Sequence, residues 1–348
     1  MKNDIYTMLN DADINLEQYE KEDFNDIERK NLKAKFRKSI NSKKSYKRNI
    51  AVATAVTLVL TVGILGGNAD VYATRVSNII GRDIGSLLGI QRNLDGYKTV
   101  VNKAVTDKGI TVKLNEVILD GNQLIVSSNI SSNEKLEGGR SWMPFFTVYV
   151  NGKKASNAAD GSGKVVDDYT TEEVMTYHLD KVDLSGDLNI KILCKSMLLD
   201  DKEKNGTWSF EFKTNGDQLK VDTREMALNN KFTLENGKEY TLSKYTDNAL
   251  GQKIYASTSA ANSKTKSAYD IVLKGNDDLG NKISFYMNYD TENETLFRTE
   301  KIDGGINKNA KTLTLTPYAA KYPEKSGRMD GEYKKAGDKF TIDLSKLK

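Results

Sequence analysis

Cysteine, histidine and proline are nearly absent from this 348-residue chain, which has one Cys, one His and three Pro. A single cysteine, Cys194, excludes an intrachain disulfide and a cysteine-based metal site. A single histidine, His178, excludes a multi-histidine zinc site, and any Ser-His-Asp or Cys-His catalysis would depend on it. We therefore expect no catalytic, cofactor-binding or metal-binding residues, and the composition favours binding or regulation over enzymatic activity.

Charge is unevenly distributed, although the net charge is only +4. Residues 1–28 contain nine acids and two bases, whereas residues 29–48 contain ten bases and no acid. The remaining 300 residues hold 40 bases and 39 acids, so they are electrically balanced. The polarised segment at the N-terminus is therefore distinct from the large body that follows it.

An uncharged run of 18 residues, Ile50 to Gly67, follows directly after this segment, and Asp70 is the first charge beyond it. At about 1.5 Å per residue, 18 to 20 helical residues cross the roughly 30 Å hydrocarbon core of a bilayer. Bases cluster on the N-terminal side of the run, so the positive-inside rule places residues 1–49 in the cytoplasm. We expect a transmembrane helix at 50–69 and residues 70–348 outside the cell. A cleaved signal peptide ending near Ala73 is the alternative, which the long preceding segment disfavours.

The expected cytoplasmic segment, residues 1–49, has few apolar residues and little prospect of a core of its own. Residues 22–40 have acids in the first turns and bases in the last, which is the order that favours a helix. Apolar side chains fall on two sides of that helix, which favours a segment that becomes ordered on a binding partner, with a solvated tail as the alternative for the acidic part. The residues expected to contact this partner are Ile5, Leu9, Phe24, Leu32 and Phe36.

Beyond the run, residues 70–96 are expected to form a juxtamembrane amphipathic helix and a linker, because apolar residues between Val76 and Leu88 follow helical spacing. From Val100 onward the apolar pattern changes to a period of two, with turn signals such as Asp120-Gly121 between short runs. This pattern predicts two β-sandwich domains of immunoglobulin-like type, at 97–218 and 219–348. The expected fold class is thus mainly β with an α-helical N-terminal part.

Several local motifs have simpler explanations than a functional site. Gly161 to Lys164 lacks the residues that complete a phosphate-binding loop and is expected to be a flexible loop. The acidic pairs at 200–201 and 277–278 lack the ligand spacing of a calcium loop and are expected in solvated turns. Aromatic residues at strand spacing are expected in the core, with a carbohydrate-binding face as the alternative. These aromatic residues are Trp142, Phe145, Phe146, Trp208, Phe285, Tyr286 and Tyr289.

Two stretches carry a family resemblance. IYTMLNDADINLEQYE (Ile5 to Glu20), followed by the acidic-to-basic helix and one apolar run, resembles the N-terminus of membrane-anchored anti-sigma factors of low-GC Gram-positive bacteria. The stretch Tyr97 to Ile130 resembles the start of the ectodomain of unknown function that many of these proteins carry.

The resemblance implies a single-pass regulator in the cell membrane that sequesters an extracytoplasmic-function sigma factor and couples envelope signals to transcription. The partners that it implies are this sigma factor and regulatory proteases, and the basic residues before the run add membrane lipid. Direct binding of nucleic acid and a cofactor are not expected. A membrane-anchored cell-surface adhesin or cell-wall-binding protein is the alternative function.

Overall fold

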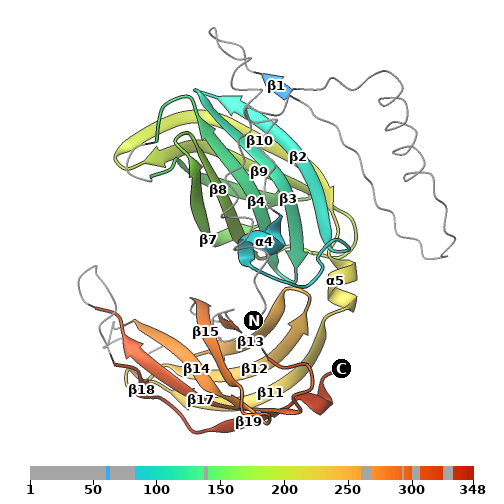
Figure 1. Cartoon of the computed structure of the whole chain (residues 1–348), viewed down its shortest axis with the longest axis vertical. Helices are drawn as coiled ribbons and strands as arrows, with labels where there is room; N and C mark the ends of the chain where they lie inside the picture. The colour runs from blue at the N-terminus through green and yellow to red at the C-terminus, as the bar shows by residue number, and fades with distance from the viewer. Residues whose placement is uncertain are drawn as a thin grey trace, which may run out of the picture. The chain divides into compact units, whose positions relative to one another are not determined.

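The computed structural model describes residues 60–62, 83–136, 140–259, 268–291, 294–299, 306–323 and 332–348. Strands dominate these residues, as the sequence pattern predicts (Figure 1). All of these described residues belong to one compact unit. It contains two apolar β cores, one built from residues 101–212 and the other from residues 226–347. We call the two parts the first and second β halves; the independent folding of 97–218 and 219–348 stays a prediction.

The first β half consists of two sheets. The six-stranded sheet has the order β1-β2-β3-β4-β8-β7, and the four-stranded sheet has the order β10-β9-β5-β6. The strands of the first sheet are β1 (Leu60–Val62), β2 (Lys98–Asp107), β3 (Ile110–Asp120), β4 (Gln123–Ser132), β8 (Thr170–Leu179) and β7 (Ser156–Asp167). Those of the second are β10 (Lys202–Thr214), β9 (Leu188–Leu199), β5 (Met143–Val150) and β6 (Lys153–Lys154).

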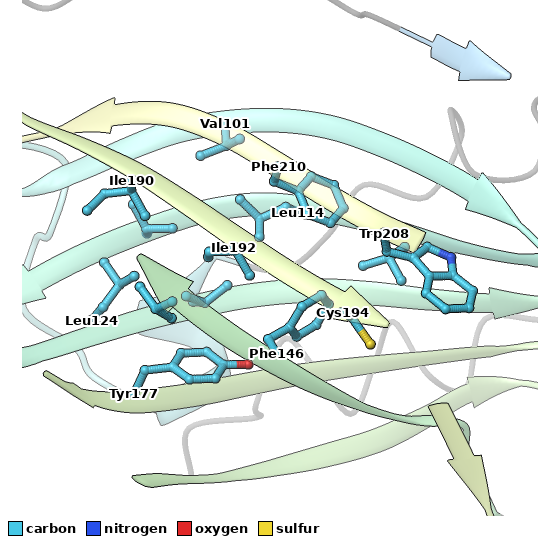
Figure 2. Close-up of a cluster of buried hydrophobic side chains, with 14 of the residues drawn as sticks. Val101, Leu114, Leu124, Phe146, Tyr177, Ile190, Ile192, Cys194, Trp208 and Phe210 are labelled. Atoms are coloured by element: carbon cyan, nitrogen blue, oxygen red, sulfur yellow. The ribbon is translucent and has the colours of Figure 1, made fainter. Parts of the chain in front are cut away.

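The core of this half lies between the two sheets, and Figure 2 shows part of it. Alternate residues of β3, such as Leu114, and of β9, such as Ile192, enter it because successive side chains of a strand point to opposite faces. Trp208 is fully buried and donates from Nε1 to the carbonyl of Ile110 at 3.0 Å. Trp142 is buried in the same core, so both tryptophans have the structural role expected of them.

The expected transmembrane helix lies almost entirely outside the described residues. Only Leu60–Val62 of it is described, as the short strand β1 paired in parallel with β2. These three residues have extended backbone instead of the expected helix. The reason is that Thr61 and Val62 are β-branched and that the edge of β2 offers backbone hydrogen-bond partners. Of the helices in the described part of the chain, none has the length and apolar content that a membrane span requires.

Helix α4 (Ile84–Leu88) is the described part of the expected amphipathic helix. The Asp83 carboxylate caps it by accepting a hydrogen bond from the Ser86 amide at 2.6 Å, and Gly89 ends it with a φ of 71°. Ile84 is fully buried against the six-stranded sheet. Residues 84–88 are thus helical and pack on the β body, whereas Val76 and Ile80 lie outside the described residues.

The second β half differs from the expected sandwich, because its strands form one nine-stranded sheet. The order is β11-β12-β13-β16-β15-β14-β17-β18, and β19 also pairs with β17. The strands are β11 (Arg224–Thr233), β12 (Glu239–Asn248), β13 (Gly251–Thr258), β14 (Tyr269–Asp277), β15 (Lys282–Asp290), β16 (Glu294–Thr299), β17 (Thr312–Lys321), β18 (Lys334–Lys335) and β19 (Phe340–Asp343).

The second half forms a single sheet because its strands pair with one another without a break. Strand β13 pairs with β16, and β14 and β15 continue the same sheet beyond it, so the ladder is unbroken from β11 to β17. The core lies on one face, where Phe232, Ile254 and Phe285 gather. The short helix α5 (Asp217–Val221) precedes this sheet, and the 3-10 helix η3 (Leu344–Lys346) follows its last strand.

The expectation of a flexible loop at Gly161 to Lys164 is wrong, because these residues belong to strand β7. Gly161 lies opposite Met175 of β8. A Cβ atom on Gly161 would come within 2.4 Å of the Met175 sulfur and of the Val174 carbonyl oxygen. The glycine is thus required by the close approach of the two strands rather than by a phosphate ligand.

Candidate functional site

The five residues expected to contact a partner, Ile5, Leu9, Phe24, Leu32 and Phe36, all lie outside the described residues. Their role stays a prediction. The described residues instead contain a polar cluster that joins the two β halves, and we call it the junction. It is formed by the end of β3, the start of β4, the β12–β13 hairpin and the segment 83–97 that follows the apolar run.

A buried ion pair lies at the centre of the junction. The Lys253 ammonium of β13 donates to the Asp120 carboxylate of β3 and, at 2.8 Å, to Oε1 of Gln123 on β4. The Asn248 side chain donates from Nδ2 to the other Asp120 oxygen at 3.0 Å. Burial by itself lowers the pKa of Lys253, but the Asp120 carboxylate outweighs burial and the pKa is raised. Lys253 is therefore held in its charged form.

Asp247, at the end of β12, connects the junction to the segment 83–97. Its carboxylate accepts from Arg92 at 3.0 Å, from Gln252 at 3.1 Å and from Arg224. Arg92 also donates to the backbone carbonyl of Asn248. Arg92 thus links the segment directly to the second β half.

The same segment is bonded to the first β half. The backbone amide of Ile84 donates to Oε1 of Glu116 on β3 at 2.7 Å. Farther along, the Tyr97 hydroxyl donates at 3.0 Å to Asp222, just after α5. The segment 83–97 therefore contacts both halves within fifteen residues.

A small apolar cluster supports these polar contacts. Its buried members are Ile84, Leu94, Ile118, Ile125, Val174 and Leu219, and Ala249 and Leu250 of the β12–β13 turn pack against it. The cluster combines the segment 83–97, the face of the six-stranded sheet opposite its main core, helix α5 and the second β half. Because water is excluded here, an unpaired Lys253 or Asp120 would be costly.

His178 forms a second contact between the halves. Its Nε2 lies 2.7 Å from the Asp160 carboxylate on β7, and Nδ2 of Asn288 on β15 donates to the same carboxylate at 3.2 Å. The His178 ring packs edge to face against Tyr289, with 4.3 Å between ring centres. Burial raises the pKa of Asp160, but the hydrogen bonds outweigh it and the pKa is lowered. These contacts give His178 packing and hydrogen-bond partners on β7 and β15.

The other chemically reactive residues of the described ranges also have structural surroundings. No group of three or more His, Cys, Asp or Glu residues is arranged to hold a metal ion in these ranges. Cys194 is buried in the first core, and burial raises the pKa of its thiol to about 11. Asp277, expected in a solvated turn, is instead buried at the end of β14, where its carboxylate accepts from the amides of Leu279 and Asn281 in the turn that follows.

Sequence reasoning did not identify the junction. In sequence Lys253 is an ordinary lysine in a strand, and Asp120 is an ordinary residue of an Asp-Gly turn. The polar run Thr246-Asp247-Asn248 at a strand end and the adjacent Gln252-Lys253 are the only signal that a buried polar contact lies there.

The chain is similar to two protein families of unknown function and to a solved structure. A family model described as "Domain of unknown function (DUF4179)" matches residues 41–132, and one described as "Family of unknown function (DUF5643)" matches residues 223–344. No curated protein matches the chain. A solved structure, "The crystal structure of the conserved domain protein from Bacillus anthracis", is similar with a TM-score of 0.53 and 19% sequence identity. The similarity covers 76% of this chain and 96% of that one, and at this identity it concerns the fold alone.

Proposed function

We propose that this protein is a single-pass membrane anti-sigma factor. In this proposal residues 1–49 lie in the cytoplasm and sequester an extracytoplasmic-function sigma factor, residues 50–69 cross the membrane, and residues 70–348 lie outside. The observation that carries the proposal is the order of an acidic block, a basic block and an uncharged run of 18 residues at the N-terminus. An adhesin needs a membrane anchor but has no use for a charge-segregated cytoplasmic segment.

The acidic block supplies long-range attraction to a basic partner, and the basic block next to the membrane favours anionic headgroups. Ile5, Leu9, Phe24, Leu32 and Phe36 supply the apolar contacts that hold the complex once it has formed. One of the family matches, residues 41–132, runs through the uncharged run and into strands β2 to β4. This continuity supports a single module that combines the anchor with the start of the β body.

The junction suggests how the β halves act on the anchor. Segment 83–97 follows the proposed span closely and is bonded to the first half through Ile84, to the second half through Arg92, and to the connection between them through Tyr97. A ligand or stress that changes the contact between the halves therefore changes the contacts of this segment. The resulting movement or exposure is what a regulatory protease outside the membrane would recognise.

Co-purification tests the proposal. The full chain is captured from detergent-solubilised membranes at low salt, and the bound proteins are examined for an extracytoplasmic-function sigma factor. We expect retention that weakens as salt rises and is lost in a variant with Ile5→Ser, Leu9→Ser and Phe24→Ser. Ile14→Ser, which replaces an apolar residue outside the predicted set, is the matched control. Absence of any sigma factor at low salt would favour the adhesin.

Topology is tested separately. Protease added to intact cells should digest the region beyond Asp70 and spare a tag on the N-terminus. A mature chain that begins near Thr74 and lacks the tag would establish a secreted protein instead.

A further inference from the structure

The nine-stranded sheet has a second face, opposite its apolar core, and one row of side chains crosses most of it. Directly paired residues of neighbouring strands lie on the same face of a sheet. The pairing connects Lys253 to Arg298, Arg298 to Tyr286, Tyr286 to Val272, Val272 to Tyr318 and Tyr318 to Lys335. The row thus combines aromatic rings with three cations and contains no acid.

Lys253 is paired with Asp120, and the rest of the row runs from Arg298 on β16, whose charge also acts on Asp160, to Lys335 on β18. Five strands lie along this distance in the order β16-β15-β14-β17-β18. Neighbouring strands are about 4.8 Å apart, which makes this part of the row roughly 19 Å long. A surface of this length fits an extended ligand better than a small molecule.

Tyrosines lie over a packed apolar base on this face. Val272 and Ala320, on neighbouring strands, are only 1% and 3% exposed and form this base. Tyr322, just beyond β17, is 47% exposed. The Tyr333 hydroxyl donates to the Asp270 carboxylate, which fixes the Tyr333 ring. Burial, the Asp270 hydrogen bond and the charge of Asp270 raise the pKa of Tyr333, so its hydroxyl stays protonated.

Basic side chains lie beside the tyrosine rings on this face. The Lys274 ammonium lies 4.9 Å from the centre of the Tyr333 ring. The charge of Asp270 also lies on this face, against the charges of Lys274, Arg298 and Lys335, and the exposed ion pair of Lys335 with Asp338 does little to neutralise that lysine. We name the set Tyr286, Tyr318, Tyr322, Tyr333, Lys274 and Arg298 the tyrosine face.

We infer that the tyrosine face is a binding surface for an anionic polysaccharide. Tyrosine rings pack against the C–H faces of sugar rings and offer hydroxyl groups to sugar hydroxyls. Lys274 and Arg298 pair with the acidic groups of such a polymer, and the length of the row suits several sugar units. The large aromatic side chains of this face are tyrosines rather than phenylalanines, which favours a polar ligand over a lipid surface. The inference does not depend on sigma-factor binding.

Affinity electrophoresis tests it with the full chain in detergent. Native gels contain hyaluronan, neutral dextran or single-stranded DNA at matched concentrations. The test variant combines Tyr322→Ala with Lys274→Gln. The control combines Tyr149→Ala with Lys213→Gln, which makes the same chemical changes on the outer face of the four-stranded sheet. Thermal melting of both variants shows whether they keep the stability of the original chain.

We expect hyaluronan to retard the chain, dextran to retard it much less, and the test variant to bind hyaluronan about tenfold more weakly while the control changes less than about twofold. Equal weakening in both variants would mean that net charge alone causes the retardation and would overturn the inference. Failure of hyaluronan to retard the folded chain, or stronger retardation by single-stranded DNA, would also overturn it. Failure of sigma-factor capture would leave this result unaffected.

Discussion

Lys253 of β13 and Asp120 of β3 form a buried ion pair although 133 residues separate them in the chain. Both are less than 10% exposed, and the side chains of Gln123 and Asn248 complete their hydrogen bonds. Removing one member of such a pair leaves the other charge buried without a partner, whereas removing both relieves that cost. The pair therefore connects the stability of the two β halves.

The first prediction concerns this pair. Lys253→Met should lower the free energy of unfolding by about 3 to 5 kcal/mol, because Asp120 is left buried and unpaired. Adding Asp120→Asn should recover part of the loss, which a double-mutant cycle by chemical denaturation measures.

The matched control is Lys244→Met. Lys244 forms a 3.1 Å ion pair with Glu225 on the same sheet, but both side chains are largely exposed. Its loss should change the unfolding free energy by less than about 1 kcal/mol. Equal effects of the two lysine substitutions would show that burial of the Lys253 pair has no energetic consequence.

The second prediction concerns pH. Glu173 of β8 is buried, and burial raises its pKa from 4.5 to about 7 despite a 2.8 Å hydrogen bond from Ser128. The folded state thus holds this proton more tightly than the unfolded state. The stabilisation is present below about pH 4.5 and is lost as pH rises to about 7, a loss of about 3 kcal/mol.

Glu173→Gln keeps the shape of the side chain and cannot ionise, so it should remove this part of the pH dependence. Thermal melting at pH 5 and pH 8 checks this, with Glu211→Gln on the exposed face of β10 as the control. Equal pH dependence in the original chain and Glu173→Gln would contradict the assignment.

The third prediction concerns strand packing. A Cβ atom on Gly275 of β14 would lie 1.8 Å from the backbone oxygen of Thr314, which cannot move without breaking the β14–β17 ladder. Gly275→Ala should therefore destabilise the protein by about 1 to 3 kcal/mol or more. Gly96→Ala, where a Cβ meets nothing within 4 Å, should have little effect on the same denaturation curve.

The fourth prediction uses the single thiol. With a pKa of about 11, buried Cys194 carries far less thiolate at pH 8 than an exposed cysteine. Its reaction with a disulfide reagent should be at least about 100-fold slower in the native protein than in denaturant. Rapid native labelling would mean that the first core opens readily.

The β content, the Asp120-Gly121 turn and the buried tryptophans are predictable from the sequence, because each depends on local alternation or turn chemistry. The helical turn at Ile84–Leu88 is predictable from the helical spacing of its apolar residues, although its Asp83 cap was not identified from the sequence. Strand β7 is not, because Gly161 and its small polar neighbours have poor strand propensity and only the close approach of β8 explains them.

The single sheet of the second half and the junction also could not be predicted. A period of two identifies strands but does not specify that β13 pairs with β16 rather than with β14. The Lys253 contact joins β13 to Asp120, 133 residues away in the chain, so no local sequence pattern indicates it. The only site residues predicted from the sequence lie in the N-terminal segment, and the role of these five residues stays a prediction.

Both tryptophans, Trp142 and Trp208, lie in the core of the first β half, and the second half contains none. Fluorescence excited at the red edge of the aromatic band therefore reports on the first half alone, whereas far-ultraviolet circular dichroism follows both sheets. Unfolding curves recorded by the two methods will coincide if the halves melt together and separate if they do not. Tryptophan fluorescence therefore makes it possible to measure how cooperatively the two halves unfold, and how far the Lys253–Asp120 pair contributes to that cooperativity.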